Sequence, residues 1–379
     1  MTTPGQWWRP RQWWARVRSV RLTRRNGILA AASAVVVVAL ATVLVVVATS
    51  GGHGKKLAGA TATTPTPTPT HTKAAPVRPK APPPKPKPKP KPINPLTGEA
   101  PSSHSVVAVK IDDTGNGRPQ RGIDKADIVY VEQAEGGLTR LLAVYNTTLP
   151  SVEPVRSTRA GDEALAMQFG PIDYVASGGS GGELAPLDRS TLRSDINDRG
   201  GPGFDRDPTR PIPFNLTADL AYAAAKLHGP KAKDIGLTWS AKIANSGSRP
   251  AYDINTMVGG TPVAFVWRND VHRYARVIGG TVDHAADGAR VTTPNVVVQF
   301  CSVTDYPQDV DTAGNPAKYT HTIGRGKVVV FRDGRRIDGT WKRSTRDDGT
   351  HLTDAHGKPL SLAPGGAWFI LVATNAPLN

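Results

Sequence analysis

The segment at residues 126–145 most constrains the fold, because it has the alternation of a β-hairpin. One strand is expected over 128–132 and the return strand over 138–145, with the Gly136-Gly137 pair at the turn. Glycine adopts positive φ at little cost, which suits that position. Since side chains alternate between the two faces of a strand, Arg140 is predicted to share a face with the apolar side chains of the return strand.

Charged residues crowd this hairpin and the segment that follows it. A guanidinium on an apolar strand face keeps its charge, so Arg140 needs an anionic partner. Glu132 lies on the facing strand, close to where Arg140 must fall. The other charged residues of this short interval are Glu135, Glu153, Arg156, Arg159 and Asp162. The sequence therefore predicts a cluster of paired charges.

Short motifs before, within and after the hairpin carry a family resemblance. In the first half they are NPLTG at 94–98, RPQ at 118–120, ADIVY at 126–130, EGGLTR at 135–140, PVRSTR at 154–159 and GGS at 178–180. In the second half they are NVVVQ at 295–299, GTW at 339–341 and PGGAWF at 364–369. Their order and spacing are similar to those of the YerB-like family of bacterial envelope proteins. The resemblance covers roughly residue 93 to the end and implies a fold family and an extracytoplasmic location, with no settled activity.

An apolar run of 21 residues at 28–48 follows a basic segment at 1–27. At 1.5 Å per residue this run is long enough to cross a bilayer core of roughly 30 Å. The arginines before this run favour a cytoplasmic location for the N-terminal tail, so the rest of the chain is expected on the outer side of the membrane. We therefore expect a single-pass protein anchored in the cytoplasmic membrane. The alternative is a cleaved signal peptide, because Ala48-Thr-Ser50 is a passable cleavage site.

Residues 49–92 are rich in Thr, Pro and Lys, which predicts a disordered, extended linker. Of the 47 Lys and Arg residues, 16 lie within residues 1–93, where there is no Asp or Glu. The remaining 31 basic residues balance all 31 acidic residues, so no basic excess is left for phosphates and nucleic acid is not an expected partner. Many members of the family resemble lipoproteins, but the single cysteine, Cys301, lies far from the N-terminus.

The part after the linker is predicted to be α+β, with mixed or antiparallel sheets and a few packing helices. It is expected to form a two-part module, with an N-terminal domain at 93–250 and a β-rich C-terminal domain at 251–379. Helices are expected from Ser157 or Thr158 through Phe169, and at 218–228.

The glycine-rich turn at 178–182 satisfies the G-x-S-x-G pattern, which places Ser180 as a possible nucleophile after a short strand. Two other interpretations stay open: a turn whose backbone N–H groups bind an anion, and a plain tight turn. The pattern is easily matched by any glycine-rich loop. No histidine nearby lies in a recognisable second motif.

These features lead to a hypothesis of ligand binding in the cell envelope. The candidate ligand-binding residues are Glu132, Glu135, Arg140, Arg156, Arg159, Gly178, Gly179 and Ser180. They favour a binding or scaffolding protein whose ligand has carboxylate or phosphate groups. The expected partner is an anionic cell-wall polymer or another protein of the envelope. The enzymatic alternative is a wall-active hydrolase or transferase that uses Ser180 or a carboxylate pair such as Glu132 and Glu135.

A further alternative is that the arginines only pair with Glu132, Glu135, Glu153 and Asp162 inside the fold. No metal and no cofactor are expected. The His and Asp side chains of His351-Leu-Thr-Asp-Ala-His356 do not have the spacing of a known metal site. The glycine-rich stretches lack the strand and helix that frame a nucleotide-binding motif.

Overall fold

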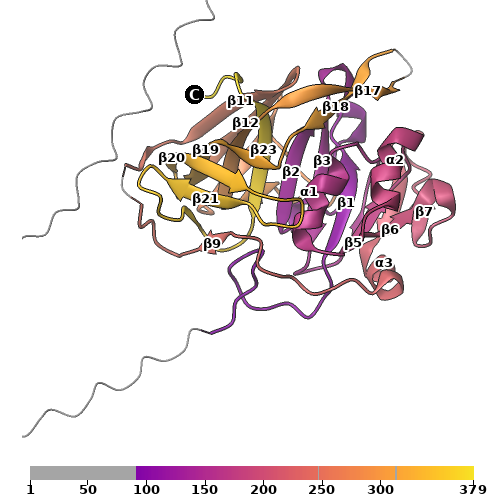
Figure 1. Cartoon of the computed structure of the whole chain (residues 1–379), viewed down its shortest axis with the longest axis horizontal. Helices are drawn as coiled ribbons and strands as arrows, with labels where there is room; N and C mark the ends of the chain where they lie inside the picture. Colours follow the sequence, from indigo (N-terminus) through magenta and orange to yellow (C-terminus); the bar gives the residue numbers. More distant parts are fainter. Residues whose placement is uncertain (1–90, 246, 312–313) are drawn as a thin grey trace, which may run out of the picture. The chain divides into compact units, whose positions relative to one another are not determined.

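The computed structural model describes residues 91–245, 247–311 and 314–379 (Figure 1). The predicted cytoplasmic tail at 1–27, the predicted membrane helix at 28–48 and the predicted linker as far as residue 90 lie outside these ranges. Within the described ranges, no helix combines the length and the apolar character needed for a membrane span.

One mixed sheet of eleven strands runs through both halves of the described chain. Its order is β10 (Arg249–Pro250), β20 (Arg335–Arg343), β19 (Gly324–Arg332), β16 (Asn295–Cys301), β23 (Ala367–Ala373), β2 (Ile128–Gln133), β3 (Thr139–Tyr145), β1 (Val107–Asp112), β5 (Asp173–Ala176) and β6 (Arg193–Ile196), and β21 (His351–Asp354) pairs with β20. The last strand in the sequence, β23, lies between β16 and β2 and is parallel to both. The two predicted parts therefore share a single sheet.

Strand directions bring several chain segments to the same sheet edge. β1 and β2 are both antiparallel to β3, while β5 and β6 run parallel to β1. Seven strands, β1, β2, β5, β6, β16, β20 and β23, therefore end at the same edge of the sheet, which we call the carboxyl edge. Ligands of open α/β sheets bind at such an edge.

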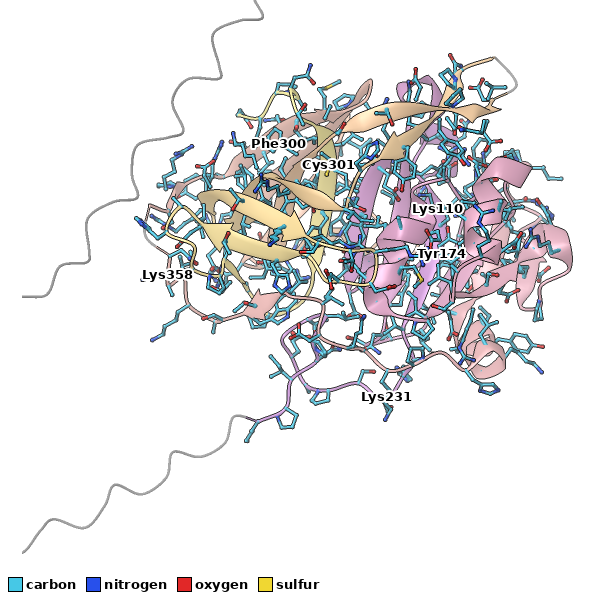
Figure 2. The ribbon with its side chains drawn as sticks, in the orientation of Figure 1. Lys110, Tyr174, Lys231, Phe300, Cys301 and Lys358 are labelled. Carbon is cyan, nitrogen blue, oxygen red and sulfur yellow. The ribbon has the colours of Figure 1, made fainter. Side chains whose placement is uncertain are left out.

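Both faces of the sheet are buried along its central strands. One face carries Val109 and Val131 and is covered by α3 (Leu220–Leu227) and by a second sheet of five strands. That sheet comprises β11 (Asp253–Val258), β12 (Thr261–Arg268), β13 (Arg273–Ile278), β14 (Thr281–Val282) and β15 (Thr292–Thr293). The opposite face carries Tyr130 and Leu142 and packs against α1 (Asp162–Ala166) and α2 (Gly181–Asp188). Phe300 and Cys301, at the end of β16, belong to different faces (Figure 2).

Smaller elements complete the described part. The hairpin of β17 (Val303–Val310) and β18 (Pro316–Thr320) lies at the upper right of Figure 1. A three-stranded sheet contains β4 (Ser151–Val152), β8 (Leu216–Asp219) and β7 (Phe204–Arg206), and β22 (Ser361–Leu362) pairs with β9 (Thr238–Trp239). The 3-10 helices are η1 (Gly115–Gly117), η2 (Ile123–Lys125), η3 (Glu135–Gly137), η4 (Met167–Phe169) and η5 (Asn197–Arg199).

The α+β fold with mixed sheets and the central hairpin are confirmed, with Glu132 opposite Arg140 in the register of β2 and β3. The first helix prediction was wrong at its start. Residues 154–156 are extended and hydrogen-bond to β1, so α1 begins only at Asp162. The second predicted helix also begins later, because Leu216–Asp219 forms β8 and Asp219 caps α3.

Candidate functional site

Charged side chains gather where β1, β2 and β3 meet the carboxyl edge. β1 ends with Asp112, which faces Arg140 of β3 in the antiparallel register. Arg140 in turn faces Glu132 of β2. All three lie on the sheet face that α1 covers, and each is buried. The hairpin thus sets the position of the charges, as the alternation predicts.

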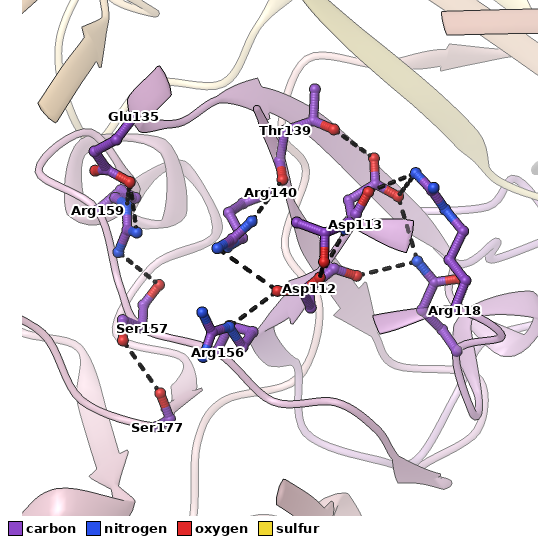
Figure 3. Close-up of polar contacts among 12 residues, drawn as sticks. Asp112, Asp113, Arg118, Glu135, Thr139, Arg140, Arg156, Ser157, Arg159 and Ser177 are labelled. Atoms are coloured by element: carbon purple, nitrogen blue, oxygen red, sulfur yellow. Dashed lines mark hydrogen bonds and ion pairs between the residues drawn. The ribbon is translucent and has the colours of Figure 1, made fainter. Parts of the chain in front are cut away.

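Two arginines share one carboxylate at this edge (Figure 3). Arg156 donates from Nε to Asp112 Oδ2 over 2.9 Å, and Nη2 of Arg140 lies 3.6 Å from the same oxygen. The other oxygen, Oδ1, accepts hydrogen bonds from the backbone N–H and the hydroxyl of Thr114. Asp112 therefore offers a single oxygen to two guanidinium groups, so this carboxylate balances only one of their two charges.

Several N–H donors of this arginine pair are unused. Arg140 donates from Nη1 to the carbonyl of Thr139, but its buried Nε has no partner among the described residues. Arg156 is 20% exposed at its side chain, and its guanidinium carbon lies 5.5 Å from the ring centre of Phe214. Burial lowers the pKa of Arg140, and the charges of Arg156 and Arg159 lower it further, whereas Asp112 raises it. An additional anion would favour the charged form of Arg140.

Arg159, in contrast, is compensated within the fold. Its Nε and Nη2 donate to Glu135 Oε2 over 3.0 and 2.7 Å, and its Nη1 lies 3.4 Å from Glu183 Oε1. Burial opposes the charge, but Glu183 and Glu135 outweigh it and raise the pKa of Arg159. The predicted arginine cluster therefore divides into an open pair, Arg140 and Arg156, and a closed ion pair at Arg159.

Glu132 binds a lysine and not Arg140. The buried Nζ of Lys110 lies 2.7 Å from Glu132 Oε1 and 2.6 Å from Asp162 Oδ1 (Lys110 is labelled in Figure 2). The hydroxyls of Tyr174 and Thr158 donate to Asp162 Oδ2, which completes the surroundings of this carboxylate. Burial raises the pKa of Glu132 to about 8, whereas the ammonium of Lys110 overcomes the burial of Asp162 and lowers its pKa. We call Lys110, Glu132 and Asp162 the buried triad.

A second buried ion pair joins the two halves of the chain. Arg276 of β13 donates from Nη2 to both oxygens of Asp113, over 2.6 and 2.8 Å. Arg118 and Thr139 also donate to Asp113, and Arg276 Nη1 lies 3.3 Å from Asp283. Arg276 and Arg118 outweigh the burial of Asp113 and lower its pKa.

Sequence reasoning missed Lys110, Asp112, Asp113 and Arg276. A signal for two of them was present, because alternation along β1 places Lys110 and Asp112 together on one face of an otherwise apolar strand. No local pattern identifies Arg276, which lies 163 residues after Asp113.

The glycine-rich turn forms a helix cap. Gly178 and Gly179 precede Ser180, the N-cap of α2, whose Oγ accepts a hydrogen bond from the Glu183 N–H. The Ser180 N–H donates to Glu183 Oε2 over 3.0 Å, which completes a capping box. The Ser-x-x-Glu spacing of residues 180–183 is a sequence signal for this arrangement that the G-x-S-x-G interpretation overlooked. A Cβ at Gly178 would lie 1.9 Å from Asp198 Oδ2, so close packing requires glycine there.

Substituting Ser180→Ala is expected to lower the free energy of unfolding by about 1 kcal/mol, because the N-cap acceptor of α2 is lost. Urea unfolding monitored by circular dichroism measures the change. Ser180→Thr serves as the control, since threonine retains a hydroxyl that can cap. Equal stability of wild type and Ser180→Ala would contradict the capping role.

Metal ligation finds no support in the described ranges, where no group of three or more His, Cys, Asp or Glu side chains could hold a metal ion. The described histidine side chains that hydrogen-bond do so elsewhere, His104 with the Asn146 carbonyl and His321 with Thr304.

The fold and the charged edge define a two-part α+β module whose halves share one sheet and are joined by the buried ion pair of Arg276 and Asp113. The first half matches the family described as "Protein of unknown function (DUF3048) N-terminal domain" at residues 96–233. The second half matches "Protein of unknown function (DUF3048) C-terminal domain" at residues 253–369. The chain therefore belongs to the YerB-like family, which carries these two domains, and the resemblance seen in the motifs is confirmed.

Two comparisons with known proteins agree with this assignment. The chain is 27% identical to "Putative lipoprotein YerB" of Bacillus subtilis (strain 168) over 296 residues, which cover 73% of this chain and 85% of that protein. The crystal structure of YerB protein from Bacillus subtilis matches with a TM-score of 0.65 and 24% identity, covering 76% of this chain and 100% of that chain. The structural match establishes the fold alone. The name of the relative is compatible with an extracytoplasmic, membrane-associated envelope protein.

Proposed function

We propose that this chain is a membrane-anchored, extracytoplasmic binding or scaffolding protein of the cell envelope that recognises an anionic ligand through Arg140 and Arg156. The observation that carries the proposal is that two guanidinium groups face one oxygen of Asp112, whose second oxygen is taken by Thr114. The anchoring follows from the predicted helix at 28–48 and is in keeping with the lipoprotein name of the relative.

The surroundings of the arginine pair suit an oxyanion. Guanidinium N–H groups form a planar fork that matches carboxylate and phosphate geometry. Ser157 follows Arg156 directly, and its hydroxyl lies 3.3 Å from that of Ser177, whose N–H donates to the Arg156 carbonyl. One of these two hydroxyls donates to the other, and the hydroxyl that accepts keeps its own proton for a ligand. The pair also sits at the carboxyl edge, near the ends of the parallel strands β1 and β5.

Carboxylate or phosphate groups of an anionic wall polymer are the proposed ligand. The contacts around the enzymatic candidates favour binding over hydrolysis or group transfer. Ser180 Oγ accepts the N–H of Glu183, Glu132 is held by Lys110, and Glu135 is held by Arg159. Glu132 and Glu135 would have to break these ion pairs to act on a substrate, and the Oγ of Ser180 serves as the N-cap acceptor of α2.

The full-length protein should bind inorganic phosphate and isolated cell-wall fractions, and Arg140→Gln or Arg156→Gln should weaken each affinity by roughly tenfold to a hundredfold. This range corresponds to the loss of one hydrogen bond to a charged group, about 1.5–3 kcal/mol. Calorimetric titration measures the phosphate affinity, and a sedimentation assay measures the wall affinity.

Arg199→Gln is the matched control, because Arg199 is an exposed arginine that pairs with Asp188 outside the site. The control should bind as tightly as wild type. Equal affinity of all four proteins for phosphate would overturn the proposal, provided that unfolding curves show Arg140→Gln and Arg156→Gln to be folded.

A further inference from the structure

A second group of basic side chains lies on the opposite face of the sheet, far along the strand order from the arginine pair. We call Arg325 and Lys327 of β19, Lys342 of β20 and His351 of β21 the basic face. All four residues are exposed. In the register of these strands Arg325 is opposite Lys342, and Lys342 is opposite His351. One row of basic side chains therefore crosses three neighbouring strands.

Contacts across the strands indicate that the row points to one side. Lys327 is opposite Thr340, and the Thr340 hydroxyl lies 3.0 Å from that of Thr353 on β21. The Lys327 ammonium lies 5.0 Å from the ring centre of Phe300, which belongs to the face covered by the second sheet. Figure 2 labels Phe300. Arg325 is two residues before Lys327 and therefore shares its side of the sheet.

Arg325, Lys327 and Lys342 form no ion pair within the described ranges, which is also true of isolated exposed lysines such as Lys226, Lys231 and Lys358. The basic face differs from these lysines because its cations are neighbours, with Arg325 directly opposite Lys342. Asp338, earlier on β20, is taken by Arg249 and Arg336. Like charges directly opposite each other on neighbouring strands are destabilising. An anionic partner would remove that cost.

We propose that the basic face binds an anionic polymer with a repeating phosphate or carboxylate, at a site separate from the arginine pair. Arg325, Lys327 and Lys342 contact successive anionic groups. Of the Thr340 and Thr353 hydroxyls, the one that accepts the hydrogen bond between them keeps its own proton and donates to the polymer. The threonines between the cations distinguish this face from a membrane-binding surface, which gains affinity by burying apolar side chains.

The test compares two triple variants of the full-length protein that change net charge equally. The patch variant is Arg325→Gln/Lys327→Gln/Lys342→Gln. The matched control is Lys226→Gln/Lys231→Gln/Lys358→Gln, whose three lysines are exposed and form no ion pair within the described ranges. Because both keep the basic N-terminal segment, its contribution to polymer binding is the same in each. The probe is poly(glycerol phosphate).

We expect the patch variant to bind about tenfold more weakly than the control at low salt. In the patch variant the slope of the logarithm of the binding constant against the logarithm of the salt concentration should be less steep by about two than in the control. The reason is that three phosphate contacts are lost, each of which releases roughly 0.7 counterion. Hydrogen exchange on the wild type should slow in peptides covering β19 and β20 when the polymer is added. An equal loss in both variants, or unchanged exchange in these strands, would overturn the proposal. Patch-dependent binding to phosphatidylglycerol vesicles with no binding to the polymer would also overturn it.

Discussion

Replacing Lys110 with methionine is expected to lower the free energy of unfolding by about 3–5 kcal/mol at pH 7. The substitution removes the cation of the buried triad and leaves Glu132 and Asp162 in the core, and breaking a buried ion pair by deleting one partner has a cost of this size. Denaturant unfolding measures the loss. Lys125→Met is the control, because that lysine pairs at the surface with Asp124 and should cost less than about 1 kcal/mol.

The pH dependence of the free energy of unfolding distinguishes an ionic role of the buried triad from simple packing of its side chains. The pKa of Glu132 is raised from 4.5 to about 8 in the folded state, mainly by burial. Folding therefore favours the protonated form, so this contribution to stability is complete below pH 4.5 and is lost as the pH rises through 8. The pKa of Asp162 is lowered, so its contribution has the opposite sign and is lost only in acid. Between pH 5 and 8 the wild type should become less stable because of Glu132.

Glu132→Gln tests that assignment, since glutamine has the shape of the protonated acid and does not titrate. We expect the variant to remain folded at pH 8 and to lose the decline in stability between pH 5 and 8. In Lys110→Met the destabilisation should shrink as the pH falls, because protonation then neutralises Asp162, whereas Glu132, with a pKa of about 8, is already mostly protonated at pH 7. A pH-independent loss in Lys110→Met would contradict the ionic role of this lysine.

Arg276→Met should be the second most damaging change, at about 3 kcal/mol or more. Both partners are buried, with side-chain exposures of 2% for Arg276 and 0% for Asp113, and their contact ties β13 of the second sheet to the residue that follows β1 of the main sheet. Arg118 continues to face Asp113 in the variant, which limits the loss. Urea unfolding at pH 7 measures it. The control is Arg268→Met on the neighbouring strand, whose exposed pair with Asp270 should matter little.

Acid unfolding provides a second measurement for the same pair. The pKa of Asp113 is lowered below 3.8 by Arg276 and Arg118 acting against its burial. The ionised form therefore stabilises the fold above pH 3.8, and the contribution is lost as the pH falls through the folded pKa. Without Arg276 this pKa should rise, so the variant should begin to unfold at a higher pH than wild type. Identical acid transitions in Arg276→Met and Arg268→Met would contradict the proposed tie.

The sequence alone determined those features that depend on neighbours in the chain. Alternation and the Gly136-Gly137 turn located the central hairpin, and the same alternation placed Arg140 opposite Glu132. The family motifs likewise identified the fold family. These features are local because side-chain alternation and turn conformation are fixed within a few residues.

Only the tertiary structure decided which charges meet. Glu132 binds Lys110 of another strand, Arg140 and Arg156 share Asp112, and Arg276 reaches Asp113 across 163 residues. These partners follow from strand order, above all from β23 lying between β16 and β2, which local periodicity does not encode. Burial then sets the pKa values, because the cost of a charge depends on what covers it and on which opposite charge lies within a few ångströms. The charged groups can be read from the sequence. Long-range packing of the sheet decides that Arg159 is paired with carboxylates inside the fold, whereas Arg140 and Arg156 share one carboxylate and keep unused N–H donors.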